Sequence, residues 1–276
     1  MKLQFSKMQG LGNDFVVFDA IHQTVQLSTQ QLRFLANRRF GVGCDQILLV
    51  EPPRSEDTDF YYRIFNADGA EVEQCGNGAR CFARFVRDKG LSHQDMIRVG
   101  TASGNIELFL QEDGQVRVNM AAPELQPRAI PFIAEQQQTV YDIMVSGKSW
   151  QISAVSMGNP HAVLVVDDVE QAPVETLGPA LEQHERFPQR VNAGFMAVRS
   201  PTEIDLRVYE RGTGETLACG SGACAAVVAG RLRGLLEEQV KVHLHGGDLV
   251  VSWAGGQSPV WMSGPAIGIF EGTIAL

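Results

Sequence analysis

A gapless internal repeat constrains the fold of this chain more than any other sequence feature. The segment RIFNADGAEVEQCGNGAR, from Arg63, lies over the segment RVYERGTGETLACGSGAC, from Arg207. Cys75 falls on Cys219 at an offset of 144 residues (219 − 75), and both segments contain Cys-Gly-x-Gly-Ala. The chain is therefore predicted to consist of two halves that arose by duplication and are related by a pseudo-twofold axis.

The repeat extends beyond these segments and predicts the domain boundaries. Gly12-Asn13 resembles Gly158-Asn159, and a Gly-initiated apolar run follows each cysteine motif further downstream. We expect an N-terminal half over residues 1–125 and a C-terminal half over residues 139–276. The stretch 126–138 carries two prolines and a run of glutamines, so it is predicted to be the linker.

Composition and charge exclude several classes of protein. The chain has 276 residues, 44% of them hydrophobic, which suits two globular domains. A net charge of −9 argues against nucleic-acid or anionic-membrane partners, which require basic patches. The sequence contains neither a signal-peptide pattern nor an apolar run of ~18 residues. Five cysteines cannot all pair within one chain, so we expect reduced thiols and a cytoplasmic location.

Apolar periodicity predicts an α+β fold. After the first cysteine motif Ala79, Phe82, Ala83 and Val86 follow helical spacing, and Gly90 supplies a stop. The second helix, predicted over 221–231, is apolar nearly all round, as expected for a helix enclosed by a sheet. Each domain is therefore predicted to be a curved mixed β-sheet or barrel around a central helix. Strands are expected at 15–18, 46–50, 61–65, 106–110, 116–120, 162–166, 204–209, 240–244 and 249–253.

Cys75 and Cys219 are the candidate catalytic residues. Each precedes a helix, whose N-terminus offers positive potential and free N–H groups that lower a thiol pKa and bind a carboxylate. Two such thiols facing one another across a shared cleft suit inversion of a carbon stereocentre. One base removes the α-proton from one face, and an acid returns a proton on the other. The pattern therefore predicts a two-base amino-acid epimerase.

Other roles for the cysteines are weaker predictions. Cys44, Cys81 and Cys224 are expected to be buried core residues. The spacings C-x5-C and C-x4-C do not match those of structural zinc sites, so no metal is expected. None of the five lysines lies in a glycine-rich phosphate context, so no pyridoxal phosphate or other cofactor is expected. A catalytically silent amino-acid-binding module and a thiol-based metal-binding protein remain alternatives.

The quoted motifs resemble those of the diaminopimelate epimerase family. The resemblance extends from Phe5 to the C-terminus and is carried by GLGNDF, FNADGAEVEQCGNGARC, MGNPH and ERGTGETLACGSGAC. It implies a cofactor-independent enzyme that interconverts LL- and meso-2,6-diaminopimelate in lysine and peptidoglycan precursor biosynthesis. It also implies a homodimer. Another two-cysteine racemase, of the proline racemase type, is the nearest alternative.

Site residues carry over from the same resemblance. Cys75 is the nominal proton donor and Cys219 the acceptor, with the roles depending on the isomer bound. His161 and Glu210 match residues that tune the proton affinities of the thiols. The helix-start positions that match the reacting-carboxylate site are Gly76, Asn77, Gly220 and Ser221. The positions that match the distal amino-acid site are Asn66, Asn159, Asn192, Glu210 and Arg211, with Asn13 and Gln46 completing the pocket.

Overall fold

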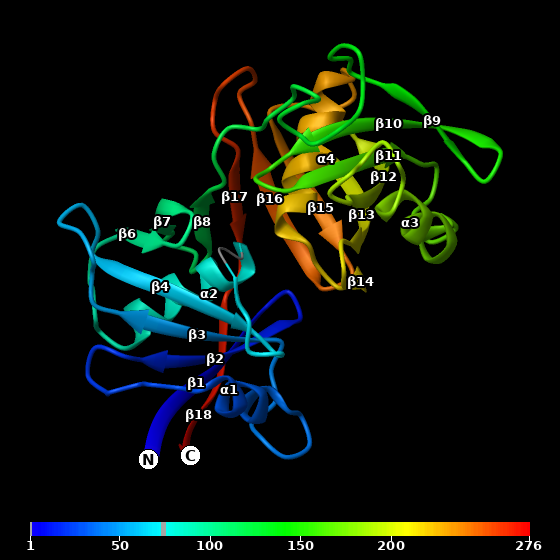
Figure 1. The fold of residues 1–276 in the computed structure, drawn as a ribbon. Helices are drawn as coiled ribbons and strands as arrows, with labels where there is room; N and C mark the ends of the chain where they lie inside the picture. The colour runs from blue at the N-terminus through cyan, green and yellow to red at the C-terminus, as the bar shows by residue number, and fades with distance from the viewer. Residues whose placement is uncertain (1, 73–75) are drawn as a thin grey trace. The chain divides into compact units, whose positions relative to one another are not determined.

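The computed structural model describes residues 2–72 and 76–276 and divides the chain into two compact units (Figure 1). The first unit comprises residues 1–119 and 263–276, and the second comprises residues 120–262. The C-terminal residues 263–276 thus belong to the first unit, although the sequence repeat assigned them to the second half.

The first unit is a mixed sheet with one central helix. Its strands pair in the order β18–β1–β2–β3–β4–β6–β7–β8, with β5 also on β4, and the β2–β3 and β4–β6 pairs are parallel. Helix α2 contacts β1, β2, β3, β7 and β8, whereas α1 contacts β3. The elements are β1 (Lys2–Gly10), β2 (Asn13–Asp19), α1 (Thr29–Ala36), β3 (Gln46–Glu51), β4 (Phe60–Asn66), β5 (Glu71–Val72), α2 (Gly76–Asp88), β6 (Met96–Thr101), β7 (Gly104–Leu110), β8 (Val116–Asn119) and β18 (Ile267–Ala275).

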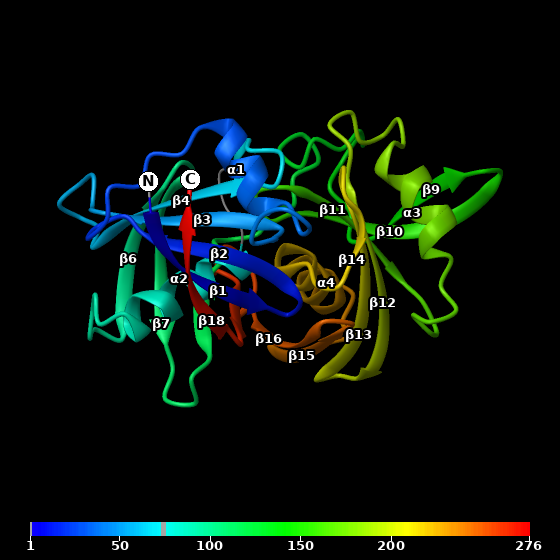
Figure 2. The same ribbon diagram turned by 90° about the horizontal axis from the view of Figure 1, so that it is seen from below.

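The second unit repeats this arrangement around helix α4, which Figure 2 shows end-on within its curved sheet. Its strands pair in the order β9–β10–β11–β12–β13–β15–β16, with β14 also on β13, and the β11–β12 and β13–β15 pairs are parallel. The elements are β9 (Tyr141–Val145), β10 (Lys148–Ser156), β11 (Pro160–Val165), α3 (Val174–Glu182), β12 (Asn192–Ser200), β13 (Glu203–Glu210), β14 (Gly214–Thr216), α4 (Gly220–Leu232), β15 (Gln239–Leu244) and β16 (Gly247–Ser252). Strand β17 (Trp261–Gly264) includes the boundary between residues 262 and 263 and so belongs to neither unit alone.

The two units therefore share one topology, which confirms the α+β prediction of a mixed sheet around a central helix. β9 pairs with β10 in a local hairpin, whereas β18 comes after the second repeat but pairs with β1 of the first unit. The pairing of β18 with β1 brings the two chain ends side by side, with Lys2 opposite Ala275 (Figure 1).

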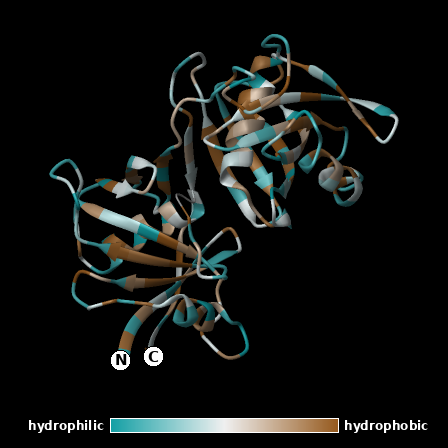
Figure 3. Ribbon diagram, viewed as in Figure 1, coloured by the Kyte–Doolittle hydropathy of each residue, from teal (hydrophilic) through white to brown (hydrophobic). Residues whose placement is uncertain are grey.

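Burial of the central elements explains the stability of each unit. Phe15, Val16, Val17 and Phe18 on β2 are all fully buried, and the hydropathy colouring in Figure 3 shows β2 and β3 as predominantly apolar. Both faces of these strands are covered, so they read as continuous apolar runs rather than alternating ones. Helix α4 is apolar on every side because residues from Gly222 to Gly230 are buried within the sheet.

The predicted linker belongs to the second unit and contributes to its core. The stretch 126–138 forms no helix or strand. Its Ile130 and Phe132 nevertheless pack with Tyr141 and Phe187 in one buried cluster, and Phe132 stacks on Phe187 at a centroid distance of 4.6 Å. The segment is thus packed against its unit rather than a free connection.

Candidate functional site

The start of α4 gathers the predicted site residues of the second unit. Cys219 is the N-cap residue of this helix, with extended backbone angles (φ −117°, ψ 108°), and its side chain is buried. Gly220 and Ser221 form the first turn. The Cys219 Sγ lies 3.6 Å from the Ser221 Oγ. A Cβ at Gly222 would lie 2.9 Å from the Val208 Cγ2 and 3.2 Å from the Cys219 Sγ, so glycine lets this turn pack closely.

Glu210, at the end of β13, forms the second contact of the thiol. Its carboxylate accepts hydrogen bonds from the Thr216 hydroxyl and from Cys219. Burial raises the pKa of the Glu210 carboxyl above its usual value, and these two hydrogen bonds oppose the rise.

Burial also raises the pKa of the Cys219 thiol well above its ordinary value, and the charge of Glu210 adds to the rise. The Ser221 hydroxyl and the Gly222 N–H of the helix start act in the opposite direction but are outweighed. The helix start thus acts to lower the pKa of the Cys219 thiol as predicted, but the predicted net lowering is wrong because burial and Glu210 outweigh it. In the free protein Cys219 carries its proton.

His161, on β11, connects the helix start to the neighbouring strand. Its Nε2 lies 3.0 Å from the Asn159 Oδ1 and 3.1 Å from the Ser221 Oγ. The ring is fully buried, and burial together with the charge of Arg211 lowers the pKa of His161 to about 3. The imidazole is thus neutral at pH 7. Among the described residues its buried Nδ1 has no hydrogen-bond partner.

Asn192 and Arg211 are linked through the backbone of a tight turn. The Asn192 Oδ1 accepts from the Arg211 N–H at 2.9 Å, while its Nδ2 donates to the Pro160 carbonyl at 2.9 Å. The exposed Arg211 guanidinium donates to the Gln189 carbonyl at 3.1 Å. Gly212 follows with φ +75° and donates its N–H to Glu182 at 2.8 Å. The turn therefore holds Arg211 at the end of β13, next to Glu210.

The first unit gathers the corresponding residues at the start of α2. The Gln46 Nε2 donates to the Asn66 Oδ1 at 2.8 Å, and the buried Gln46 Oε1 has no partner within the described part of the chain. The Asn77 Nδ2 lies 3.5 Å from the Asn13 Oδ1, next to the helix start at Gly76. The prediction for Cys75 falls outside the described residues.

Sequence reasoning did not identify three residues that support these sites. Thr216 binds Glu210, Asp45 accepts from the Asn13 Nδ2 at 3.0 Å, and the fully buried Arg80 donates to the Asn77 Oδ1 at 3.0 Å. A signal for Arg80 was available, because it aligns with Cys224 on the all-apolar second helix. Its place on a buried face was thus predictable. The expected burial of Cys44, Cys81 and Cys224 is confirmed.

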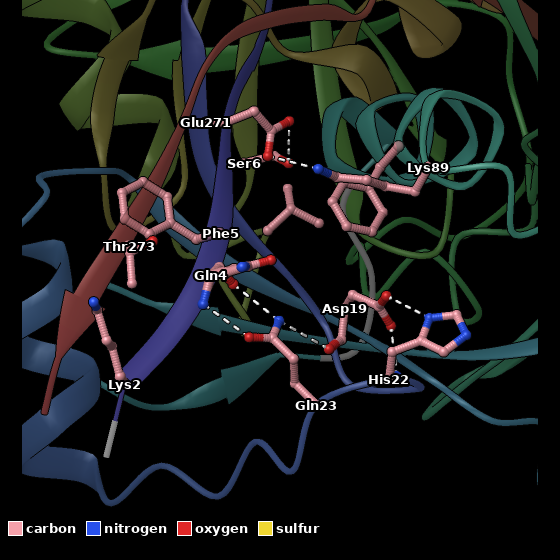
Figure 4. A pocket seen from close by; sticks show the side chains of 12 residues that line it. Lys2, Gln4, Phe5, Ser6, Asp19, His22, Gln23, Lys89, Glu271 and Thr273 are labelled. Atoms are coloured by element: carbon pink, nitrogen blue, oxygen red, sulfur yellow. Dashed lines mark hydrogen bonds and ion pairs between the residues drawn. The ribbon is translucent and has the colours of Figure 1, made fainter.

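A cavity of about 490 Å³ lies elsewhere in the first unit and contains none of the predicted site residues. It is lined by side chains of β1, β2, β18 and α2, and Figure 4 shows that many of its polar groups bind one another. Lys89 pairs with Glu271 at 2.6 Å, and His22 pairs with Asp19 at 2.8 Å. These groups satisfy each other, so the cavity offers no convergent set for chemistry.

Two further observations concern metals and membranes. Residues 2–72 and 76–276 contain no cluster of three or more His, Cys, Asp or Glu side chains arranged to hold a metal ion. None of the helices in this described part has the length and apolar character needed to cross a membrane.

Proteins of similar sequence are diaminopimelate epimerases. A family model described as Diaminopimelate epimerase matches residues 5–126 and 153–268. The chain is 64% identical over 276 residues to a diaminopimelate epimerase of Thioalkalivibrio sulfidiphilus, with 99% of each chain covered. It is 60% identical to that of Cupriavidus necator, covering 100% of this chain and 98% of the relative.

Solved structures show the same fold at much lower identity. A hydroxyproline epimerase from Agrobacterium vitis, solved with trans-4-hydroxy-L-proline, superposes with a TM-score of 0.70 at 16% identity. The match covers 100% of this chain and 93% of that one. The fold is therefore that of a wider group of proteins, and the sequence matches are far more specific.

Proposed function

Because the chain belongs to the diaminopimelate epimerase family, we propose that it interconverts LL- and meso-2,6-diaminopimelate, a step of lysine and peptidoglycan precursor biosynthesis. The chain is an isomerase that acts on a small molecule. The observation that carries the proposal is the position of Cys219. It caps the N-terminus of α4 and touches both Ser221 and Glu210, where family resemblance places a catalytic thiol.

The proposed reaction is a two-base proton exchange at the α-carbon. A thiolate accepts the α-proton and becomes a thiol, while the other thiol gives its proton to the opposite face of the same carbon and becomes a thiolate. We assign these roles to Cys75 and Cys219, without a cofactor. By motif position Cys75 is the nominal proton donor and Cys219 the acceptor, and the isomer that is bound decides which cysteine acts as the base. The reverse direction exchanges the two roles.

The reaction needs donors for the charge that develops on the substrate carboxylate. The α-proton of an amino acid is weakly acidic, so oriented donors must stabilise the carbanion-like state. We assign this role to the helix starts at Gly76-Asn77 and Gly220-Ser221, whose N–H groups have no intrahelical acceptor. The neutral His161 contacts the Ser221 hydroxyl at 3.1 Å and so orients it.

Recognition of the distal amino-acid group supports diaminopimelate rather than a simple amino acid. The exposed guanidinium of Arg211 suits a carboxylate, and the carboxylate of Glu210 and the unpartnered Gln46 Oε1 suit an ammonium. Together with Asn13, Asn66, Asn159 and Asn192, these residues form the proposed binding set. A substrate without the distal group would leave such polar groups unpaired, which disfavours ordinary amino acids.

We also propose a cytoplasmic homodimer. Three large apolar side chains of β18, Ile267, Ile269 and Phe270, are each about half exposed, and exposed apolar patches of this kind often mark an interface. Analytical ultracentrifugation is expected to show a dimer, and a monomer at micromolar concentration would contradict this assignment.

The test is an NMR time course in D2O with the reduced enzyme and LL-diaminopimelate. We expect meso product with deuterium at one α-carbon, and a loss of at least about a thousandfold in rate for Cys219→Ala. Cys224→Ala is the matched control, because Cys224 is buried on the same helix one turn beyond the site. Its rate is expected to stay near that of the wild type.

The same experiment separates the alternatives. Turnover of proline without turnover of diaminopimelate would favour a racemase of the proline racemase type. No α-proton exchange with either substrate, together with measurable binding, would favour a non-catalytic amino-acid-binding module. Equal activity in Cys219→Ala and Cys224→Ala would contradict the thiol assignment itself.

A further inference from the structure

Two charged side chains contact the side-chain amides of Asn13 and Asn77. These amides belong to the predicted site residues of the first unit, which are called its half-site below. The guanidinium of Arg80 donates from Nη2 to the Asn77 Oδ1 at 3.0 Å, and its Nη1 reaches the Gly76 carbonyl at 3.5 Å. On the other side, a carboxylate oxygen of Asp45 accepts from the Asn13 Nδ2 at 3.0 Å. The two amides face each other, with the Asn77 Nδ2 at 3.5 Å from the Asn13 Oδ1.

The two charged side chains determine the orientation of each side-chain amide. A guanidinium has only donors, so it requires the oxygen of Asn77 on its side. An ionised carboxylate has only acceptors, so it requires the nitrogen of Asn13 on its side. Each amide is thereby fixed by its own charged partner at 3.0 Å, and the longer contact between the amides agrees with both orientations.

The surroundings hold both charges in place. Arg80 has no exposed surface and also donates to the Pro265 carbonyl at 3.2 Å. A Cβ at Gly10 would lie 3.3 Å from its Nη2, so the glycine leaves room for the guanidinium. Asp45 accepts from the Arg38 Nη2 at 2.7 Å. Neither charge can turn away without losing these partners.

We propose that Arg80 and Asp45 are positioning residues that set the polarity of the Asn13–Asn77 pair, so that it presents a donor beside an acceptor. The inference rests on the proposed function, in which these amides bind the substrate. A nitrogen of Asn77 suits a carboxylate, and an oxygen of Asn13 suits an ammonium. A flipped Asn77 would instead bring a carbonyl oxygen against the carboxylate and repel it.

In the second unit the polar side chain at the helix start is oriented without a charged partner. The use of charged residues for this purpose is therefore specific to the first unit. At the position of Arg80 the second helix carries Cys224, which is buried and uncharged. There Ser221 takes the place of Asn77, and a hydroxyl can rotate to suit its partner. A rotating group needs no charged residue to choose its orientation.

The test compares the steady-state kinetics of four variants on LL-diaminopimelate. Arg80→Met removes the donor at similar length, and Asp45→Asn keeps the shape but adds a donor. We expect each to raise KM or lower kcat so that kcat/KM falls about tenfold, the cost of one misoriented hydrogen bond, which is buried for Arg80 and exposed for Asp45. Arg80→Lys keeps a donor-only cation and is expected to recover most of the loss. Arg84→Met, on the same helix and paired with the partly exposed Asp88, is expected to stay within about twofold.

A second readout does not depend on turnover. In protein labelled with 15N-asparagine, Asp45→Asn is expected to shift the side-chain amide pair of Asn13, and Arg80→Met that of Asn77. Unshifted amides would overturn the inference whether or not the enzyme is active. Equal kcat/KM for Arg80→Lys and Arg80→Met would reduce Arg80 to a packing role. Asp45→Asn decides the case should Arg80→Met fail to fold, since the Asp45 side chain is 45% exposed.

The outcomes distinguish this inference from the proposed function. A wild-type enzyme that exchanges no α-proton of diaminopimelate refutes the proposed function. A wild-type enzyme that does, with Asp45→Asn and Arg80→Met at full activity, refutes only the positioning role.

Discussion

The half-sites of the two units share a backbone frame but differ in chemistry. In each, a parallel strand pair places one residue beside another in the same register, Phe15 opposite Gln46 in the first unit and His161 opposite Asn192 in the second. At the end of the next strand the first unit has Asn66 where the second has Glu210. The duplication thus kept the positions and changed the ionisable groups.

The two half-sites therefore use different groups to orient and bind a ligand. In the first unit neutral amides are oriented by charges placed behind them, with Asp45 and Arg80 in the outer positions. In the second unit the titratable groups themselves, Glu210 and His161, surround the thiol and its helix turn. The proton affinity of Cys219 is therefore expected to change when Glu210 is neutralised.

The largest expected effect comes from Glu210→Gln, which makes the second half-site resemble the first. The change removes the negative charge beside Cys219 but leaves an amide oxygen that can still accept from its thiol, so kcat/KM is expected to fall by about a hundredfold or more through loss of the charge. Glu215→Gln is the control, because Glu215 pairs with Arg207 away from the thiol. Steady-state assays of both variants check this, and equal losses would indicate a structural cause.

Asp14→Asn tests a partly buried ion-pair network of the first unit that has no counterpart at the matching positions of the second. Asp14 binds Lys7 at 2.6 Å and Arg38 at 2.7 Å, whereas the register positions of Lys7 and Asp14 in the second unit hold Ala154 and Pro160. The variant is expected to lose about 2 kcal/mol of unfolding free energy, less than the ~3–5 kcal/mol for a fully buried pair. Urea denaturation at pH 7 measures this.

The stability that this ion-pair network contributes depends on pH, and the direction follows from the shift in the pKa of Asp14. The hydrogen bonds from Arg38 and Lys7 hold the pKa of the Asp14 carboxyl below its usual range and outweigh burial, which acts to raise it. Its contribution is therefore present above the unfolded pKa of ~3.9 and is lost as pH falls through the folded value. Wild-type stability should decline below about pH 4 more steeply than that of Asp14→Asn. Parallel curves would contradict the assignment.

His161→Phe places in the second unit the residue that the first unit has at the matching position, Phe15. Its expected effect on activity is smaller than that of Glu210→Gln. Loss of the partner of Ser221 is expected to lower kcat/KM about tenfold. The pKa of His161 is lowered to about 3 by burial. Between that value and the unfolded pKa of ~6.5 the unfolded state binds the extra proton, so wild-type stability falls as pH drops through this window.

The unfolding free energy of His161→Phe as a function of pH therefore provides a second test, in addition to its kinetics. His161→Phe should show a shallower loss of unfolding free energy from pH 6.5 to pH 4 than the wild type. The reverse substitution, Phe15→His, buries an imidazole among apolar residues and is expected to destabilise the protein by about 1–3 kcal/mol. Identical pH profiles for the wild type and His161→Phe would show that His161 is not buried as a neutral ring.

Much of the fold was predictable from local pattern. The helices after each cysteine motif and the strands expected around them are present, because apolar periodicity and glycine stops act over a few residues. The pairing of β9 with β10 is a local hairpin across residues 146 and 147. The pairing of β18 with β1 was not predictable, since β18 follows the second repeat but joins the first unit. Long-range pairing of this kind leaves no local signal.

The residues of the candidate site likewise divide into those that local motifs predicted and those whose role depends on long-range contacts. The motifs identified Cys219, Glu210, His161 and Ser221, and the structure brings them together at the start of α4. The direction of the Cys219 pKa shift was predicted wrongly, because the helix N-terminus is visible in sequence whereas burial is not. Arg80 and Asp45 were missed because their role depends on contacts across strands and a helix.

Cys219 carries its proton in the free enzyme because it is buried beside Glu210. The most direct test is the 13Cβ chemical shift of Cys219 as a function of pH in 13C-cysteine-labelled protein, with the signal assigned from Cys219→Ala. Cys219 is expected to remain a thiol past pH 8.5, the ordinary cysteine value, and Glu210→Gln is expected to lower the midpoint of its titration. A thiolate at pH 7, or a midpoint unchanged in Glu210→Gln, would contradict it.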